Sequence, residues 1–136
     1  MKIELRNINF VPNNKVVIKN VNLTINNGIT TLLGQNGSGK TTLMKLMCNI
    51  KEPTSGEIFI NNDNIINISR NQVARKLSYV SQDRENIQGF TVYEYVEMGR
   101  FPYQNFMGTY DNSSKLIIDR SLKTVNMHDR KEDFVN

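Results

Sequence analysis

Residues 34–41, Gly-Gln-Asn-Gly-Ser-Gly-Lys-Thr, combine glycines, a lysine and a hydroxyl at a spacing that suits phosphate binding. The glycines let the backbone turn tightly and point successive N–H groups into one concavity. Lys40 offers a positive charge to the β- and γ-phosphates, and the Thr41 hydroxyl can ligate Mg²⁺. The pattern predicts a site for ATP and Mg²⁺ made by Gly34, Gln35, Asn36, Gly37, Ser38, Gly39, Lys40, Thr41 and Thr42.

The neighbouring sequence supplies the elements that would position this loop. Residues 29–33 are apolar, as expected for a buried strand of a parallel sheet, and residues 42–48 carry apolar side chains at helical spacing. A helix that follows the loop would aim the positive end of its dipole at the phosphates. A glycine-rich turn that carries a lysine by chance is the alternative, and the strand–loop–helix setting argues against it.

The other N-terminal elements read as strands and one short helix. Residues 2–10 alternate apolar and polar side chains, and residues 15–25 form a second strand-like stretch rich in Val and Ile. A break at Pro53-Thr54-Ser55-Gly56 precedes a strand at 57–61, and a helix at 69–75 precedes a strand at 76–81.

The character of the chain changes after Gln82. Residues 91–100 and 113–127 show helical patterns. The sequence therefore predicts an α/β fold: a mixed sheet around one helix, with N-terminal antiparallel strands, followed by the start of a helical subdomain. We expect a nucleotide-binding core over residues 1–88 and a partial helical subdomain over 89–136.

The composition favours a globular protein in the cytoplasm. The chain has 136 residues, of which 38% are hydrophobic, and no apolar run approaches the ~20 residues that cross a bilayer. The single Cys48 forms no internal disulfide. The net charge of +4 comes from scattered side chains, so we expect no nucleic-acid partner. Frequent asparagine is interpreted as a bias in loops and turns.

Three segments resemble the ATP-binding cassette (ABC) family of P-loop ATPases. Residues 34–43 are similar to its Walker A motif, residues 53–58 to its Pro-x-x-Gly-x-Ile turn and strand, and residues 79–82 to the strand that ends in its Q-loop glutamine. The resemblance covers essentially the whole chain in the order of the family, and it implies binding and hydrolysis of ATP.

Two further site residues follow from this resemblance. Phe10 occupies the place of an aromatic that stacks on adenine, although an aromatic at the end of a strand is more often core. Gln82 occupies the place of the glutamine that reaches Mg²⁺ and the attacking water, whereas a lone glutamine after a strand would carry no meaning. The resemblance thus implies Lys40 and Gln82 as catalytic residues, with Thr41 and Gln82 as Mg²⁺ ligands.

Residues 91–103 resemble a segment of the importers for iron–siderophore, haem and cobalamin complexes. Locally the same residues are an amphipathic helix ended by Gly99 and Pro102. The resemblance implies an ATPase subunit on the inner face of the membrane, with a homodimeric partner in the full-length protein. It also implies transmembrane permease subunits that dock through Gln82 and residues 90–110.

The family also uses a Leu-Ser-Gly-Gly-Gln signature, a Walker B Asp-Glu pair and a switch histidine, and the 136 residues contain none of them. Residues 115–119 end in Asp119, but they are followed by Arg and fit a helix better than a Walker B strand, and His128 is expected at the surface. We therefore expect a chain truncated before the signature and inactive alone. The alternatives are a soluble ABC protein of the ribosome or DNA, a small P-loop kinase and a non-catalytic remnant.

Overall fold

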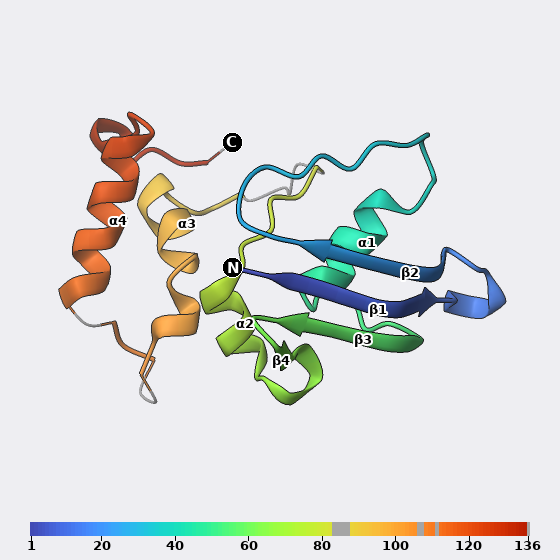
Figure 1. The fold of residues 1–136 in the computed structure, drawn as a ribbon. Helices are drawn as coiled ribbons and strands as arrows, with labels where there is room; N and C mark the ends of the chain where they lie inside the picture. The colour runs from blue at the N-terminus through green and yellow to red at the C-terminus, as the bar shows by residue number, and fades with distance from the viewer. Residues whose placement is uncertain (83–87, 106–107, 111, 136) are drawn as a thin grey trace. The chain divides into compact units, whose positions relative to one another are not determined.

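The computed structural model describes residues 1–82, 88–105, 108–110 and 112–135 (Figure 1). The chain divides into two compact units, Met1–Tyr79 and Val80–Asn136. The first unit holds a small sheet and two helices, and the second holds a pair of helices. The fold is α/β, as predicted from the sequence.

The sheet of the first unit is antiparallel throughout. Its strands are β1 (Ile3–Phe10), β2 (Ile18–Ile25), β3 (Ser55–Ile60) and β4 (Asp63–Asn64), in the order β2-β1-β3-β4. The register places Leu5 of β1 opposite Leu23 of β2 on one side and opposite Ile58 of β3 on the other. The predicted strands at 2–10, 15–25 and 57–61 are thereby confirmed.

Helix α1 (Lys40–Met47) packs on the inner face of this sheet. Leu43 and Leu46 lie on one side of the helix because they are three residues apart, and both are buried. They join a core that also contains the inward-facing isoleucines and leucine of the strands (Ile3, Leu5, Ile8, Ile18, Ile58 and Ile60). The apolar alternation of the strands and the helical spacing after the loop therefore meet in one core.

Asparagine was predicted in loops and turns, but several asparagines lie inside the strands β1 and β2. Asn7 of β1 and Asn20 of β2 have φ of 50° and 48°, and the register between these strands shifts beside them. The Asn22 side chain accepts a hydrogen bond from the Asn7 N–H at 2.8 Å, and the Asn9 side chain accepts one from the Asn20 N–H at 2.8 Å. Side-chain amides thus replace ladder bonds where the strands bulge.

Gly56 is required where β3 approaches this bulge. Its φ is +94°, and a Cβ at this position would lie 2.5 Å from the carbonyl oxygen of Asn7 and 2.6 Å from that of Arg6. Both obstacles are backbone atoms, which a side-chain rotation does not remove. The glycine of the Pro-Thr-Ser-Gly turn therefore allows β1 and β3 to pair.

The outer face of β1 carries a charged triplet. Glu4 accepts a hydrogen bond from Lys2 at 2.9 Å and from Arg6 at 2.8 Å. These two cations, Arg6 foremost, hold the pKa of Glu4 at about 2. The Arg6 guanidinium also lies 4.3 Å from the centre of the Phe59 ring on β3. The charged side chains on the solvent side of the sheet therefore also cover this aromatic ring.

Two predicted strands are wrong. Residues 29–33 form no strand, with Ile29 99% and Leu33 85% exposed, and residues 76–81 form none either. A strand is stable only beside a neighbouring strand that forms hydrogen bonds with it. Among the described residues, neither of these two segments has such a neighbour. The apolar composition had suggested burial in a parallel sheet, whereas every ladder among the described residues is antiparallel.

Helix α2 (Arg70–Lys76) confirms the predicted helix at 69–75. It begins in a capping box, in which the Ser69 hydroxyl accepts from the Gln72 N–H at 3.3 Å and the Gln72 side chain accepts from the Ser69 N–H at 2.9 Å. Val73 is the residue of this helix that joins the core of the first unit.

The second unit contains α3 (Val92–Met98) and α4 (Asn112–Thr124), which confirm the helices predicted near 91–100 and 113–127. The first N–H groups of α3 are all satisfied: Asp133 and Lys131 accept from Val92 and Tyr93 at 2.9 and 2.8 Å, and Thr91 caps Glu94. Residues 115–119 lie in α4, so the rejection of a Walker B strand there is confirmed.

We expect Gly56→Ala to destabilise the protein by about 3 kcal/mol, because the new Cβ would clash with two carbonyl oxygens in a left-handed backbone. Gly28→Ala is the matched control, since Gly28 has φ +117° but nothing within 4 Å of the new Cβ. Its cost should be only the conformational one, about 1 kcal/mol. Urea unfolding followed by circular dichroism measures both, and equal losses would contradict the role of the β1–β3 approach.

Candidate phosphate-binding site

The predicted phosphate loop lies between the extended residues 29–33 and the start of α1. Residues 34–38 are exposed, and the Ser38 N–H donates to the Gln35 carbonyl at 3.2 Å in a turn. Gly37 and Gly39 have φ of 80° and 90°, which glycine adopts without strain. The loop therefore uses its glycines as the sequence pattern predicts.

Gly39 also fixes the distance between the loop and the sheet. A Cβ at Gly39 would lie 2.8 Å from the Ile18 Cδ1 atom and 3.1 Å from the Val17 carbonyl oxygen. The entry of α1 is thus pressed against the start of β2. This contact joins two segments far apart in the sequence, and spacing alone did not reveal it.

Lys40 closes the loop on itself. Its Nζ donates to the carbonyl oxygens of Gly34 and Gln35, each at 2.8 Å. An ammonium group has three donors, so one remains for a phosphate oxygen after these two bonds. The lysine thereby ties the two ends of the loop together, and its remaining donor is available to an anion.

The backbone around Lys40 offers further donors. No described residue accepts a hydrogen bond from the backbone N–H groups of Gly37, Gly39, Lys40 or Thr41. Three of these groups belong to the beginning of α1, which carries no acidic residue in its first turn. Free N–H groups together with the positive end of the helix dipole form a site for an anion.

The unit that contains the loop is basic. Residues 1–79 hold ten lysines and arginines against four aspartates and glutamates, whereas residues 80–136 hold seven against nine. The positive charge of the chain therefore resides in the unit with the phosphate loop, where it attracts a polyanion.

The residues predicted to hold Mg²⁺ would do so through oxygen atoms. Thr41 lies exposed in the first turn of α1, and Thr42 beside it is half-buried. Gln82 is exposed and belongs to the second unit, and its role as a ligand stays a prediction. Among the described residues, no group of three or more His, Cys, Asp or Glu side chains could hold a metal. The Thr41 hydroxyl, at the start of α1, is an oxygen donor of the kind that suits a Mg²⁺ ion bound largely through phosphates.

Phe10 ends β1 as a half-buried ring that packs against the core. The Lys51 ammonium lies over this ring, 5.5 Å from its centre. The structure therefore gives Phe10 a packing role, and its predicted stacking on adenine would have to use the exposed part of the ring.

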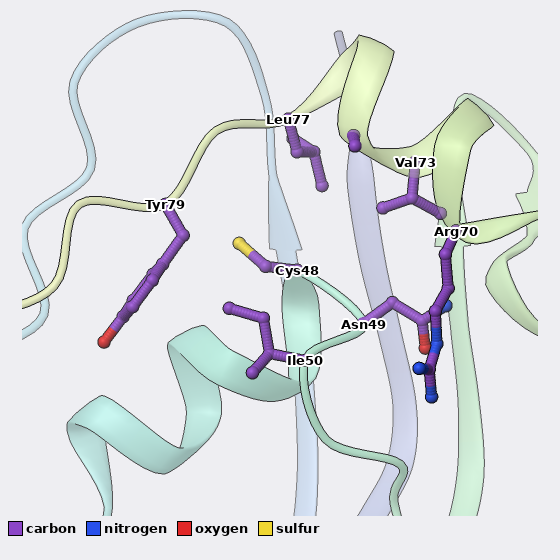
Figure 2. A pocket seen from close by; sticks show the side chains of 8 residues that line it. Cys48, Asn49, Ile50, Arg70, Val73, Leu77 and Tyr79 are labelled. Atoms are coloured by element: carbon purple, nitrogen blue, oxygen red, sulfur yellow. The ribbon is translucent and has the colours of Figure 1, made fainter. Parts of the chain in front are cut away.

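A cavity lies at the end of α1 away from the loop. Its volume is about 390 Å³, and Figure 2 shows the side chains of Cys48, Ile50, Leu77 and Tyr79 around it. Burial raises the pKa of the Cys48 thiol, so at neutral pH the group is a poor nucleophile. This cavity had no signal in the sequence, and its lining combines apolar side chains with Asn49 and Arg70.

The aromatic segment 90–110 of the second unit is only partly packed. Phe90, Tyr95, Phe101 and Tyr103 are exposed, whereas Phe106 lies outside the described residues. The Arg100 guanidinium lies 3.7 Å from the centre of the Tyr103 ring and donates to the Ser114 hydroxyl, which is fully buried, at 3.3 Å. Arg100 thus ties the end of α3 to α4. No helix among the described residues is long and apolar enough to cross a membrane.

The sequence profile of the ABC transporter family matches residues 18–136. The chain is 34% identical over 119 residues to the iron(3+)-hydroxamate import ATP-binding protein of Bacillus subtilis, and this alignment covers 87% of this chain and 44% of the relative. It is 52% identical over 59 residues to the zinc import ATP-binding protein of Rickettsia conorii, which covers 43% of this chain and 25% of that relative.

A solved structure of the ATP-binding subunit of an ABC transporter has a similar fold. It superposes with a TM-score of 0.78 at 19% identity, over 98% of this chain and 54% of that one. The chain therefore spans about half the length of the proteins that it resembles.

Proposed function

The chain belongs to the ABC transporter family, and from this premise we propose that it is the nucleotide-binding part of the ATPase subunit of a metal-chelate importer. Nucleotide binding follows from the family. The observation that carries the proposal is the loop at residues 34–41, where backbone N–H groups without an acceptor among the described residues and the third donor of Lys40 lie at the start of α1.

The residues of this chain would divide the work of holding ATP. The loop N–H groups and Lys40 bind the phosphates, Thr41 and Gln82 supply oxygen ligands to Mg²⁺, and Phe10 stacks on the adenine. Mg²⁺, when bound, neutralises charge on the phosphates and so eases attack by water. Lys40 and Gln82 are the proposed catalytic residues, because one neutralises the transferred phosphoryl group and the other orients the water.

The proposed cargo is an iron(III)–siderophore or a related metal chelate. The support comes from residues 91–103, which resemble the segment of chelate importers, and from the hydroxamate relative. The zinc relative provides zinc as a second candidate cargo, on the strength of its 52% identity over 59 residues. The full-length protein would work as a homodimer on the cytoplasmic face of the membrane.

The proposed partner is a transmembrane permease that docks on Gln82 and residues 90–110. The exposed rings of Tyr95 and Phe101 support this interface, since exposed aromatic side chains are frequent anchors in protein contacts. Movement of the helical unit on nucleotide binding would then be passed to the permease.

We expect the 136-residue chain to bind ATP weakly and to release no phosphate. The loop provides phosphate contacts, but the chain contains no Asp-Glu pair or signature to activate the water. Titration calorimetry with ATP and Mg²⁺ tests binding, with Lys40→Ala expected to lose it. Steady phosphate release that disappears in Lys40→Ala would contradict the expectation of inactivity, and equal binding by both proteins would contradict the site.

In a full-length protein that carries this chain, Phe10→Ala should weaken ATP binding about fivefold, whereas Phe10→Tyr should keep it, because a stacked ring contributes about 1 kcal/mol. Lys51→Ala is the companion variant, since it removes the cation over the ring but leaves the ring in place. Affinity for ATP and thermal stability are measured for all three. Loss of stability without loss of affinity in Phe10→Ala would assign the ring to the core alone.

For the interface, the variants are Phe101→Ala and Tyr95→Ala, because Arg100 and Tyr103 hold each other within the fold. Both should weaken co-purification of the full-length protein with its permease several-fold and leave ATP binding unchanged. Leu116→Ala is the matched control, as Leu116 is 70% exposed on α4 outside the aromatic segment. Normal assembly of both aromatic variants would remove the proposed interface.

The cargo is tested by the growth of cells that depend on the full-length protein. Growth with iron–hydroxamate as the iron source supports the proposed cargo, and rescue restricted to zinc-limited medium would replace it by zinc.

A further inference from the structure

Two Asn-Gly pairs occur in the sequence, at Asn27-Gly28 and Asn36-Gly37. Asparagine before glycine is chemically fragile, because without a Cβ on the next residue its backbone nitrogen can reach the side-chain carbonyl carbon. The second pair lies inside the phosphate loop. The first lies in the turn after β2 and serves as an internal comparison.

The structure leaves Asn36 unprotected. Asn36 is exposed in a turn, and no described residue makes a hydrogen bond with its side chain. Gly37 has φ +80°, nothing within 4 Å of its missing Cβ, and a backbone N–H without an acceptor among the described residues. The attacking nitrogen and the attacked carbonyl carbon are therefore both unrestrained.

Asn27 is also exposed, but its side chain is held. Its Oδ1 accepts a hydrogen bond from the N-terminal ammonium of Met1. This hydrogen bond favours one orientation of the Asn27 side chain, whereas the Asn36 side chain has no such partner among the described residues. The two pairs share the same dipeptide and the same exposure class, and they differ in this restraint.

We propose that Asn36 is a site of spontaneous deamidation that inactivates the phosphate loop. The Gly37 nitrogen bonds to the Asn36 side-chain carbonyl carbon and loses its proton, and the side-chain nitrogen leaves as ammonia. One water then opens the succinimide ring, at either of its carbonyls, to give aspartate or isoaspartate. No oxidant or cofactor takes part.

Either product damages a loop that is built for an anion. Aspartate is ionised at neutral pH and places a negative charge beside the phosphates. Isoaspartate also inserts a methylene into the main chain and displaces the N–H groups that form the concavity. This consequence rests on the proposed binding of nucleotide at residues 34–41. A bound phosphate that engages the Gly37 N–H would slow the first step, so ATP should protect the site.

The test incubates the 136-residue chain at slightly alkaline pH, with and without ATP and Mg²⁺, and maps deamidation and isoaspartate by peptide mass spectrometry. We expect Asn36 to be modified several-fold faster than Asn27, and ATP to slow modification at Asn36 only. Equal or faster modification at Asn27, or no protection of Asn36 in a protein that binds ATP, would overturn the proposal. Asn36→Gln should remove the fast modification, because glutamine would have to form a six-membered ring and cyclises much more slowly than asparagine.

Affinity for ATP gives the second readout. Asn36→Asp should weaken binding by about tenfold or more, whereas Asn27→Asp, with the same change of charge outside the loop, should leave it unchanged. Unaltered binding in Asn36→Asp would overturn the inactivation. If the unmodified chain itself binds no ATP, the proposed function fails, and the rates at Asn36 and Asn27 without ATP still decide whether the fragile site exists.

Discussion

The close approach of Gly39 to Val17 and Ile18 is the contact on which the site depends. It joins the first turn of α1 to the start of β2, so the loop is held between a helix and a sheet that pack on one shared core. A Cβ at position 39 would meet the Ile18 side chain and the Val17 carbonyl oxygen, so a glycine allows this close approach without rearrangement. Leu43 and Leu46 of the same helix are buried in that core, so the entry of α1 and its apolar face both lie against the sheet.

The parts of the fold that were predictable are those that local chemistry decides. The alternation in β1, the spacing of Leu43 and Leu46, and the helical pattern of residues 91–100 each depend on neighbours within a few residues, and the structure confirms these elements. Residues 29–33 and 76–81 were misassigned because pairing of a strand depends on a neighbour distant in sequence. An apolar run indicates a preference for burial, but it does not supply the partner that would bury it.

The candidate site shows the same division. The glycines and Lys40 of the loop could be identified from their spacing, because the pattern itself states which backbone shape and which charge are needed. Three contacts could not be identified from the sequence, because each depends on how side chains are oriented in the folded chain. They are the hydrogen bonds from Lys40 to Gly34 and Gln35, the Lys51 ammonium over the Phe10 ring, and the hydrogen bond from Arg100 to Ser114. The asparagines in the bulged strands could not be predicted either. Their left-handed conformation is required by the shift of register between two paired strands and not by a turn.

The two bonds of Lys40 have a consequence for the thermodynamics of ligand capture. A glycine-rich loop has many conformations, and ordering it only when a ligand arrives would consume part of the binding free energy. Lys40 already restricts the loop in the free protein, so that entropy is lost during folding instead. Arginine could not take its place without change, because a planar guanidinium distributes its donors in a fixed fork, whereas the ammonium directs its donors tetrahedrally. In the proposed phosphate loop, the residue that carries the charge is thus also the residue whose hydrogen bonds restrict the loop before a ligand binds.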